Sequence, residues 1–236
     1  MNPLRPRSLD DLFVFATTPH GEFAVHLVTA PDQSLVWDTA VPFVQKMVRE
    51  ITEFTVESFG GELDEASADG IRAHIQNIDA FAIASSRGQI QGFAAGKFLD
   101  KSFFHLHGVA VRHSTKNKGV AKLLVQHLWG NSNLPQMCFT TQSPVMFCLG
   151  RSLVTEIFPN TTTGIPSSLQ KDAKKLLGGR DEGFCPESGV VSNLYGRCLY
   201  PQIPLSNNPD VNTWFAEALG IQDSKTRNGF LFIGSR

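Results

Sequence analysis

The sequence is short of charge and of long apolar runs. Charged residues make up 18% of its 236 positions, and 21 basic against 22 acidic side chains leave a net charge of −1. Such a balance provides no net positive charge to attract nucleic acid or an anionic membrane surface. No apolar run approaches the ~20 residues needed to cross a bilayer. Asp10 and Asp11 interrupt the start before an apolar run too brief for an export signal. We therefore expect a cytoplasmic protein that binds neither nucleic acid nor membrane.

Cysteine is also scarce, and its spacing carries no metal signature. The chain has 4 cysteines, with no CxxC pair or other zinc spacing. In a chain without an export signal we expect them to be reduced and mostly buried rather than bridged. We predict no metal site. The hydrophobic content of 42% is enough to bury the core of one domain, with or without an elaborate extension.

The most informative stretch covers residues 102–129, SFFHLHGVAVRHSTKNKGVAKLLVQHLW. Its pattern predicts a strand at 103–111, a short basic loop at 112–118 and a helix at 119–129 that Gly130 ends. A strand that passes into a helix through such a loop directs successive backbone N–H groups to one place, where the helix dipole adds to them. Four positive side chains accompany this turn, Arg112, Lys116, Lys118 and Lys122. The stretch therefore predicts a phosphate site.

The same residues resemble a known motif. Lys116-Asn117-Lys118-Gly119-Val120-Ala121 resembles the pyrophosphate-binding motif of the GNAT acyltransferase superfamily, with lysine in place of the first arginine or glutamine. Gly108-Val109-Ala110-Val111 looks like the end of that family's splayed fourth strand, whose backbone pairs with pantetheine. The resemblance implies acetyl-CoA, or another acyl-CoA, as co-substrate. It implies as contacts Val109, Ala110, Val111, Lys116, Asn117, Lys118, Gly119, Val120 and Ala121. The alternative interpretation is an ordinary turn with a solvated basic loop.

Periodicity predicts the remaining elements. We expect strands or hairpins at 12–16, 23–29, 80–84, 90–99, 137–142, 190–195 and 229–234. We expect helices at about 42–59, 66–76, 144–153, 166–177 and 211–219, the fourth capped by Ser167 or Ser168. Glycines at 92 and 96 suggest a bulge or close packing in their strand.

This order resembles the GNAT fold, an α/β (α+β) architecture with a mixed, mostly antiparallel twisted sheet and helices on both faces. Residues 1–157 would form the acyl-CoA-binding core. Residues 158–236 would form a C-terminal extension that completes the sheet and covers the acceptor cleft, within a single domain overall. The final strand makes sense only if it pairs back into the sheet. Trp214, Phe215, Tyr195 and Tyr200 are candidates for the substrate pocket, although aromatic residues at these spacings are more often core.

Two histidines are the candidate bases. On an extended strand His105 and His107 point to the same face. Imidazole titrates near neutrality and so suits a general base. His107 aligns with a position where several GNAT members carry a catalytic glutamate. The alternative is that both are half-buried strand histidines held by hydrogen bonds.

Tyrosine is the residue whose scarcity bears most on mechanism. Many family members carry, on the helix after the fifth strand, a tyrosine that protonates the departing thiolate. Here that helix offers Phe147 and Cys148, and the chain has only Tyr195 and Tyr200. Three explanations stay open: the thiolate leaves unassisted, the extension supplies the proton, or the protein does not catalyse. Cys148 fits a core position better than an acid or nucleophile. Gln142 falls near a position where the family often has asparagine.

The resemblance predicts an acyl-CoA-dependent N-acyltransferase that moves acetyl from acetyl-CoA to a small-molecule amine. The alternative is a catalytically inactive GNAT-like module for acyl-CoA binding or protein interaction. A third option keeps the CoA site but uses a longer acyl chain or an oxygen acceptor. Nothing in the pattern predicts the oligomeric state.

Overall fold

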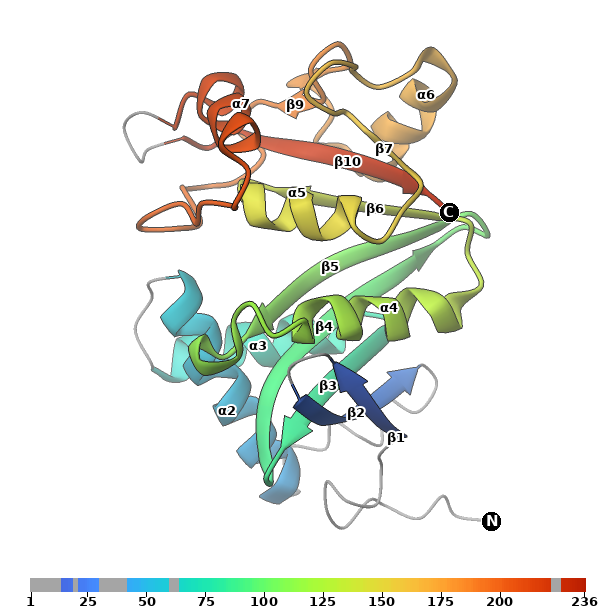
Figure 1. Cartoon of the computed structure of the whole chain (residues 1–236). Helices are drawn as coiled ribbons and strands as arrows, with labels where there is room; N and C mark the ends of the chain where they lie inside the picture. Colours follow the sequence, from blue (N-terminus) through green and yellow to red (C-terminus); the bar gives the residue numbers. More distant parts are fainter. Residues whose placement is uncertain (1–13, 19–20, 30–41, 60–63, 222–225) are drawn as a thin grey trace. The chain divides into compact units, whose positions relative to one another are not determined.

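The computed structural model describes residues 14–18, 21–29, 42–59, 64–221 and 226–236 (Figure 1). The chain forms two compact units: unit 1 contains Met1–Phe98 and Leu106–Asn133, and unit 2 contains Leu99–His105 and Leu134–Arg236. Strand β5 (Phe103–Val111) contributes its first three residues to unit 2 and the others to unit 1. None of the helices in the described ranges is both long enough and apolar enough for a membrane span.

Unit 1 is a sheet with helices on both faces. Its strands follow the order β1-β2-β3-β4-β5, and the pairings of β1 with β2, β2 with β3 and β3 with β4 are antiparallel. The strands before β5 are β1 (Val14–Thr18), β2 (Gly21–Thr29), β3 (Ala80–Ser86) and β4 (Gln89–Leu99). The helices are α2 (Pro42–Phe59), α3 (Glu65–Gln76) and α4 (Val120–Ser132).

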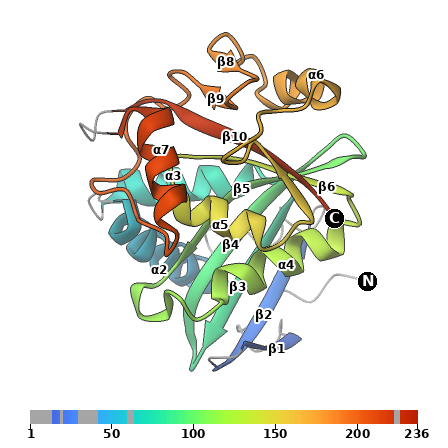
Figure 2. The ribbon, with the colours of Figure 1, turned by 45° about the horizontal axis from the view of Figure 1, so that its top comes forward.

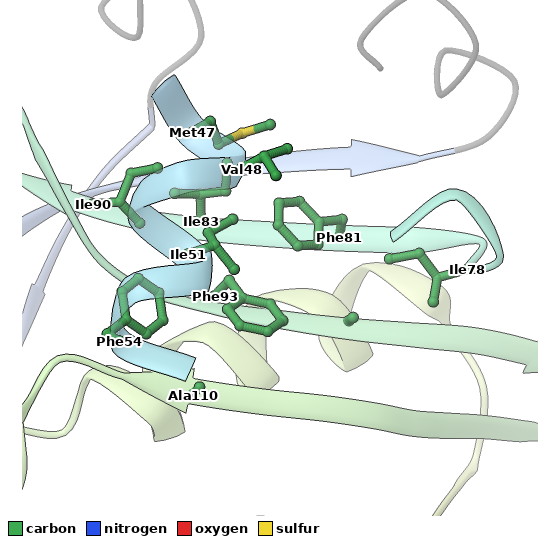
Figure 3. Close-up of a cluster of buried hydrophobic side chains, with 11 residues drawn as sticks. Met47, Val48, Ile51, Phe54, Ile78, Phe81, Ile83, Ile90, Phe93 and Ala110 are labelled. Carbon is green, nitrogen blue, oxygen red and sulfur yellow. The ribbon is translucent and has the colours of Figure 1, made fainter. Parts of the chain in front are cut away.

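Large and small side chains separate onto the two faces of β3 and β4. Phe81 and Ile83 of β3 and Phe93 of β4 share one face and pack against α2, in the cluster shown in Figure 3. The alternate residues are alanine or glycine, with Ala84 opposite Gly92. A Cβ on Gly92 would lie 3.3 Å from Leu124 Cδ1 of α4 and 2.8 Å from Val111 Cγ1. Because strand residues alternate between faces, the small residues let α4 lie close to the sheet opposite α2 (Figure 1).

Unit 2 is built around the last strand, β10 (Gly229–Ser235). Residues 233–235 of β10 pair at once with β6 (Gln136–Thr141) and with β7 (Glu156–Phe158), so the two neighbours take opposite edges. Strand β9 (Val190–Val191) pairs with the start of β10 and with β8 (Phe184–Cys185), and β6 pairs in parallel with the first three residues of β5. The expected pairing of the final strand is confirmed.

Successive side chains of β10 also point to opposite faces of the sheet and pack in two different clusters. Leu231 and Ile233 join Ala173 of α6 (Ser167–Leu176) in one buried cluster. Phe230 and Phe232 lie on the opposite face, where α5 (Pro144–Arg151) and α7 (Pro209–Leu219) neighbour each other at a steep angle (Figure 2). The ring centroids of Phe147 and Phe232 are 4.9 Å apart, and those of Phe215 and Phe230 are 4.8 Å apart. These distances suit offset or edge-on aromatic packing.

Three local expectations need correction. Helix α4 continues through Gly130 and ends before Asn133, whose φ of 54° is left-handed. Pro166, not a serine, stands at the start of α6, with no side-chain cap. Only Val190 and Val191 of the expected 190–195 strand are in β9. The expected irregularity in the strand of Gly92 is confirmed: the register of β3 with β4 shifts between Ala84 and Ser85, where Gln91 is the extra residue on β4, and Gly92 beside it also serves close packing. Part of the expected first strand, residues 12–13, lies outside the described residues.

Candidate functional site

In unit 1 a strand, a tight loop and a helix follow one another as the sequence predicts. β5 ends at Val111, the short helix η2 (His113–Thr115) follows, and α4 begins at Val120. Asn117 and Gly119 have φ of 64° and 80°, in the left-handed region. Glycine enters this region freely, and asparagine tolerates it better than most other residues. The residue types in the loop therefore fit the backbone that it adopts.

The loop presents a group of open backbone donors. Gly119 caps α4 without a side chain, whereas Ser143 and Asn208 cap α5 and α7 with theirs. Within the described part of the chain, five amides at this turn have no hydrogen-bond acceptor, those of Asn117, Gly119, Val120, Ala121 and Lys122. Open amides at the positive end of a helix form an anion site.

Two of the predicted contacts have to act through their side chains alone. The amide of Lys116 donates to His113 O at 3.1 Å, and that of Lys118 donates to Thr115 O at 3.2 Å. Both side chains are exposed, and Lys122 is half-buried. No ion pair occupies these three lysines among the residues that the structure describes. Among the predicted contacts at residues 116–121, the amides of Lys116 and Lys118 are therefore already used within the loop. The amide of Lys122, which is not among the predicted contacts, is open.

Arg112 does not belong to this group of free charges. Its Nε donates to Ile90 O at 2.6 Å, and its Nη2 lies 3.5 Å from Glu50 Oε2 and 3.8 Å from Glu53 Oε2. The guanidinium also stands 5.4 Å from the centre of the Phe54 ring. Arg112 therefore fastens the loop to α2, and the notion that it adds charge for phosphate is not supported. Such fastening holds the open amides in place before an anion arrives.

The end of β5 leaves another set of backbone groups available. The amide of Arg112 donates to Gln91 O of β4 at 2.9 Å. Backbone groups along a strand alternate in direction, so the amides of Val109 and Val111 point away from β4. The pairing of β5 with β6 covers only Phe103–His105. That Val109 and Val111 bind an extended ligand stays a prediction, while Ala110 is buried and faces the core.

His107, the candidate base, meets a partner that the sequence did not indicate. Its side chain is exposed, and its Nδ1 lies 3.4 Å from Nε2 of His74 in the last turn of α3. The ring centroids are 4.6 Å apart. Burial, followed by the nearby His107 and Lys97, lowers the pKa of His74 to about 4. His105, two residues earlier on β5, is half-buried.

In unit 2, Gln142 is a structural residue. It is fully buried, and its Nε2 donates to Thr226 O at 3.2 Å and to Asn228 O at 2.8 Å. Its Oε1 accepts a bond of 2.8 Å from the amide of Leu199. The side chain therefore ties the end of β6 to two distant segments, with its amide fully engaged.

The two tyrosines have different settings. Tyr195 donates to Thr140 Oγ1 at 3.1 Å, and burial raises its pKa to about 12. The hydroxyl of Tyr200 is hydrogen-bonded to the side chains of Ser143 and Thr141, at the start of α5, and burial raises its pKa. The extension thus brings a phenol to the helix on which the sequence lacks one.

The remaining aromatic and cysteine candidates differ in how deeply they are buried. Phe215 is fully buried, so it belongs to the core rather than to a pocket, whereas Trp214 is half-buried. All four cysteines are free, as expected, but only Cys138 is buried. Burial raises the pKa of the Cys138 thiol, which keeps it protonated and unreactive. No group of three or more histidine, cysteine, aspartate or glutamate side chains suited to a metal occurs in the described ranges.

Comparisons with known proteins bear on this site. Residues 45–129 match the family model described as Acetyltransferase (GNAT) family. A search of curated proteins gave no match.

Several solved structures are similar to the chain. A GNAT family acetyltransferase from Elizabethkingia anophelis with acetyl-CoA bound shares 13% identity, over 91% of this chain and 98% of that one, with a TM-score of 0.43. An IAA acetyltransferase from Bacillus cereus shares 12%, over 90% and 99%, with a TM-score of 0.43. A phosphinothricin acetyltransferase from Sinorhizobium meliloti in complex with AcCoA shares 19%, over 61% and 81%, with a TM-score of 0.40.

Proposed function

We propose that the chain is a GNAT acetyltransferase, whose family model its residues 45–129 match, and that it transfers the acetyl group of acetyl-CoA to the amine of a small molecule. The observation that carries the cofactor assignment is the uncapped start of α4. Five open amides there stand beside the lysines at 116, 118 and 122. The pyrophosphate of CoA supplies the negative charge that such a turn binds.

The proposed reaction is a direct acyl transfer. The amides of Val109 and Val111 hold the pantetheine arm and polarise the thioester carbonyl. His107 takes a proton from the amine, directly or through water, as the nitrogen forms its bond to the carbonyl carbon. The C–S bond then breaks, and CoA leaves as the thiolate. Orientation and carbonyl polarisation account for most of the acceleration, and the base for roughly 10²- to 10⁴-fold.

The departing thiolate can be assisted by the extension. Tyr200 keeps its proton, because its pKa is raised and lies above that of a thiol, about 8.5. It therefore acts by donating a hydrogen bond to the thiolate rather than by losing its proton outright. Its place against Ser143, the cap of α5, is what favours it over Cys148.

Replacing Tyr200 with phenylalanine tests this role. We expect kcat to fall about tenfold, the size of one ordinary hydrogen bond, with KM for acetyl-CoA unchanged. Tyr195→Phe is the matched control, because Tyr195 bonds Thr140 and packs against Gly229, and we expect its kcat to match that of the wild type. Equal kcat in Tyr200→Phe and wild type would mean that the thiolate leaves unassisted.

The acceptor class rests on composition and on the extension. A net charge of −1 supplies no field for a polycationic acceptor such as a protein tail. Residues 158–236 in this proposal cover the acceptor cleft, and Trp214 and Tyr200 are two of their half-buried aromatic side chains. Such rings favour a small acceptor with modest charge.

The function is tested by titrating the purified protein with acetyl-CoA in a calorimeter and by following thiol release with a panel of small amines. We expect a Kd in the micromolar range, about −8 kcal/mol, and amine-dependent release of CoA. Binding without release with any amine would favour the non-catalytic module. If neither acetyl-CoA nor CoA binds, the acetyltransferase assignment loses its basis. Longer acyl-CoAs and alcohols then test the remaining option.

A further inference from the structure

We propose that Glu50 of α2 is a positioning residue for acyl-CoA: without contacting the ligand, it holds Ile90 and Arg112, and through them the loop whose open amides receive the pyrophosphate. The inference rests on the proposed function for the identity of that anion. Three observations within unit 1 carry it: the bonds of the Glu50 carboxylate, the contacts that lead from Arg112 into the loop, and the burial of the charged pair.

The side chains of Glu50 and Arg112 hold one residue of β4 by both of its backbone groups. Glu50 Oε2 accepts a bond of 2.8 Å from the amide of Ile90, and Arg112 Nε donates to Ile90 O at 2.6 Å. The two side chains also meet each other, because Arg112 Nη2 lies 3.5 Å from Glu50 Oε2. Bonds to charged groups are stronger than those between neutral groups. One carboxylate of α2 thus joins the start of β4 to the residue that follows β5.

Further hydrogen bonds extend this connection into the loop. Gln91 O accepts the amide of Arg112 at 2.9 Å. The hydroxyl of Thr115, a buried residue, shares its hydrogen between Gln91 O at 3.2 Å and Arg112 O at 3.0 Å. The carbonyl of Thr115 in turn accepts the amide of Lys118 at 3.2 Å. These contacts link α2, through β4, to the residue that precedes the cap of α4.

Burial gives this pair more influence than an ion pair on the surface has. The side chains of Glu50 and Arg112 are only 12% and 23% exposed, and partly buried pairs are screened less by salt. The other charged neighbours are weaker partners. Lys46 Nζ lies 3.6 Å from Glu50 Oε1 but is 62% exposed, and Glu53 Oε2 is 3.8 Å from Arg112 Nη2 and 34% exposed. Glu50 is therefore the main anchor for the guanidinium.

Such an anchor matters because the loop has to keep an unusual backbone. Gly119 has φ of 80° and, as a glycine, can leave this region at little cost. A loop already in its binding geometry loses less freedom when the anion arrives. Removal of Glu50 takes the acceptor from the Ile90 amide and the nearest carboxylate from Arg112. The fraction of molecules with a competent loop then falls, and the apparent Kd rises in proportion.

Calorimetry with acetyl-CoA on the full chain measures this effect. Glu50→Ala is expected to bind about tenfold more weakly than the wild type, the net worth of one ordinary hydrogen bond. Glu50→Gln keeps an oxygen for the Ile90 amide but not the charge that faces Arg112, and its Kd should lie between the two. Ile83→Val is the control, because it destabilises the core cluster under α2 without touching the charged pair, and it should bind like the wild type. Wild-type affinity in Glu50→Ala, shown to be folded by thermal unfolding, would overturn the proposal.

Hydrogen exchange of the protein without ligand examines the loop independently of any cofactor. The amides of Thr115, Lys116 and Lys118 are all bonded to carbonyls of residues 112–115, so their protection reports the loop geometry. We expect their exchange to become about tenfold faster in Glu50→Ala and to stay unchanged in Ile83→Val. Unchanged exchange in Glu50→Ala, or equal acceleration in both variants, would overturn the positioning role. If the wild type binds no acetyl-CoA, the proposed function fails, while the exchange rates still decide whether Glu50 holds the loop.

Discussion

Glutamate at position 119 is expected to weaken acetyl-CoA binding by at least about 100-fold, which corresponds to about 2.8 kcal/mol. Gly119 caps α4 with φ of 80°, directly before open amides. A carboxylate there lies at the positive end of the helix and competes with the pyrophosphate for the same donors, while repelling it. A negative charge at the N-terminus of α4 also stabilises the helix. This gain offsets part of the roughly 1–2 kcal/mol that the left-handed backbone costs a non-glycine residue. We therefore expect the variant to fold.

Two control variants separate the effects of charge, side-chain bulk and backbone strain on acetyl-CoA binding. Gly88, in the turn between β3 and β4, has φ of 72°, and a Cβ added to it would meet nothing within 4 Å, so Gly88→Glu introduces the same backbone strain and charge away from the loop. It should bind acetyl-CoA like the wild type. Gly119→Gln keeps the bulk without the charge and should lie between the two. Calorimetry and thermal unfolding are measured on all four proteins. Wild-type affinity in a folded Gly119→Glu protein would remove the phosphate site from this loop.

The sequence predicts well where the decisive signal is local. The apolar face of α2 and the turn from β5 to α4 each occupy one contiguous stretch, and both lie where predicted. The glycine at 119 was expected to admit a ligand, and the structure shows in addition that its backbone is left-handed. Strands of two residues such as β8 and β9 leave too short a pattern to recognise.

The sequence does not predict the role of a side chain that bonds to a residue far away along the chain. Arg112 and its partner Glu50 are separated by much of unit 1, and nothing in the loop distinguishes Arg112 from the lysines beside it. The three bonds of Gln142 reach residues 57 to 86 positions away. His74 is likewise an unremarked histidine at the end of a helix until the fold brings it to His107. Local pattern thus predicts a candidate site, and long-range packing decides which of its side chains already have structural partners.

Substitution of His107 is expected to give the largest loss of turnover. His107→Ala should lower kcat by roughly 10²- to 10⁴-fold, the usual contribution of a general base. The Kd for acetyl-CoA should not change, because the proposed phosphate donors lie in residues 117–122 and the proposed pantetheine donors are backbone amides. His107→Gln keeps a polar side chain without a basic nitrogen and should be equally impaired. Single-turnover kinetics at saturating acetyl-CoA and amine measure the step directly.

His105 provides the internal comparison, because it is the other histidine of β5 and is half-buried. His105→Ala in the same assay should retain kcat within a few-fold if His107 is the base. The reverse result, with loss of turnover in His105→Ala and wild-type turnover in His107→Ala, would transfer the role of general base to His105. Wild-type turnover in both variants would mean that the amine loses its proton to solvent, and that binding and orientation alone carry the reaction.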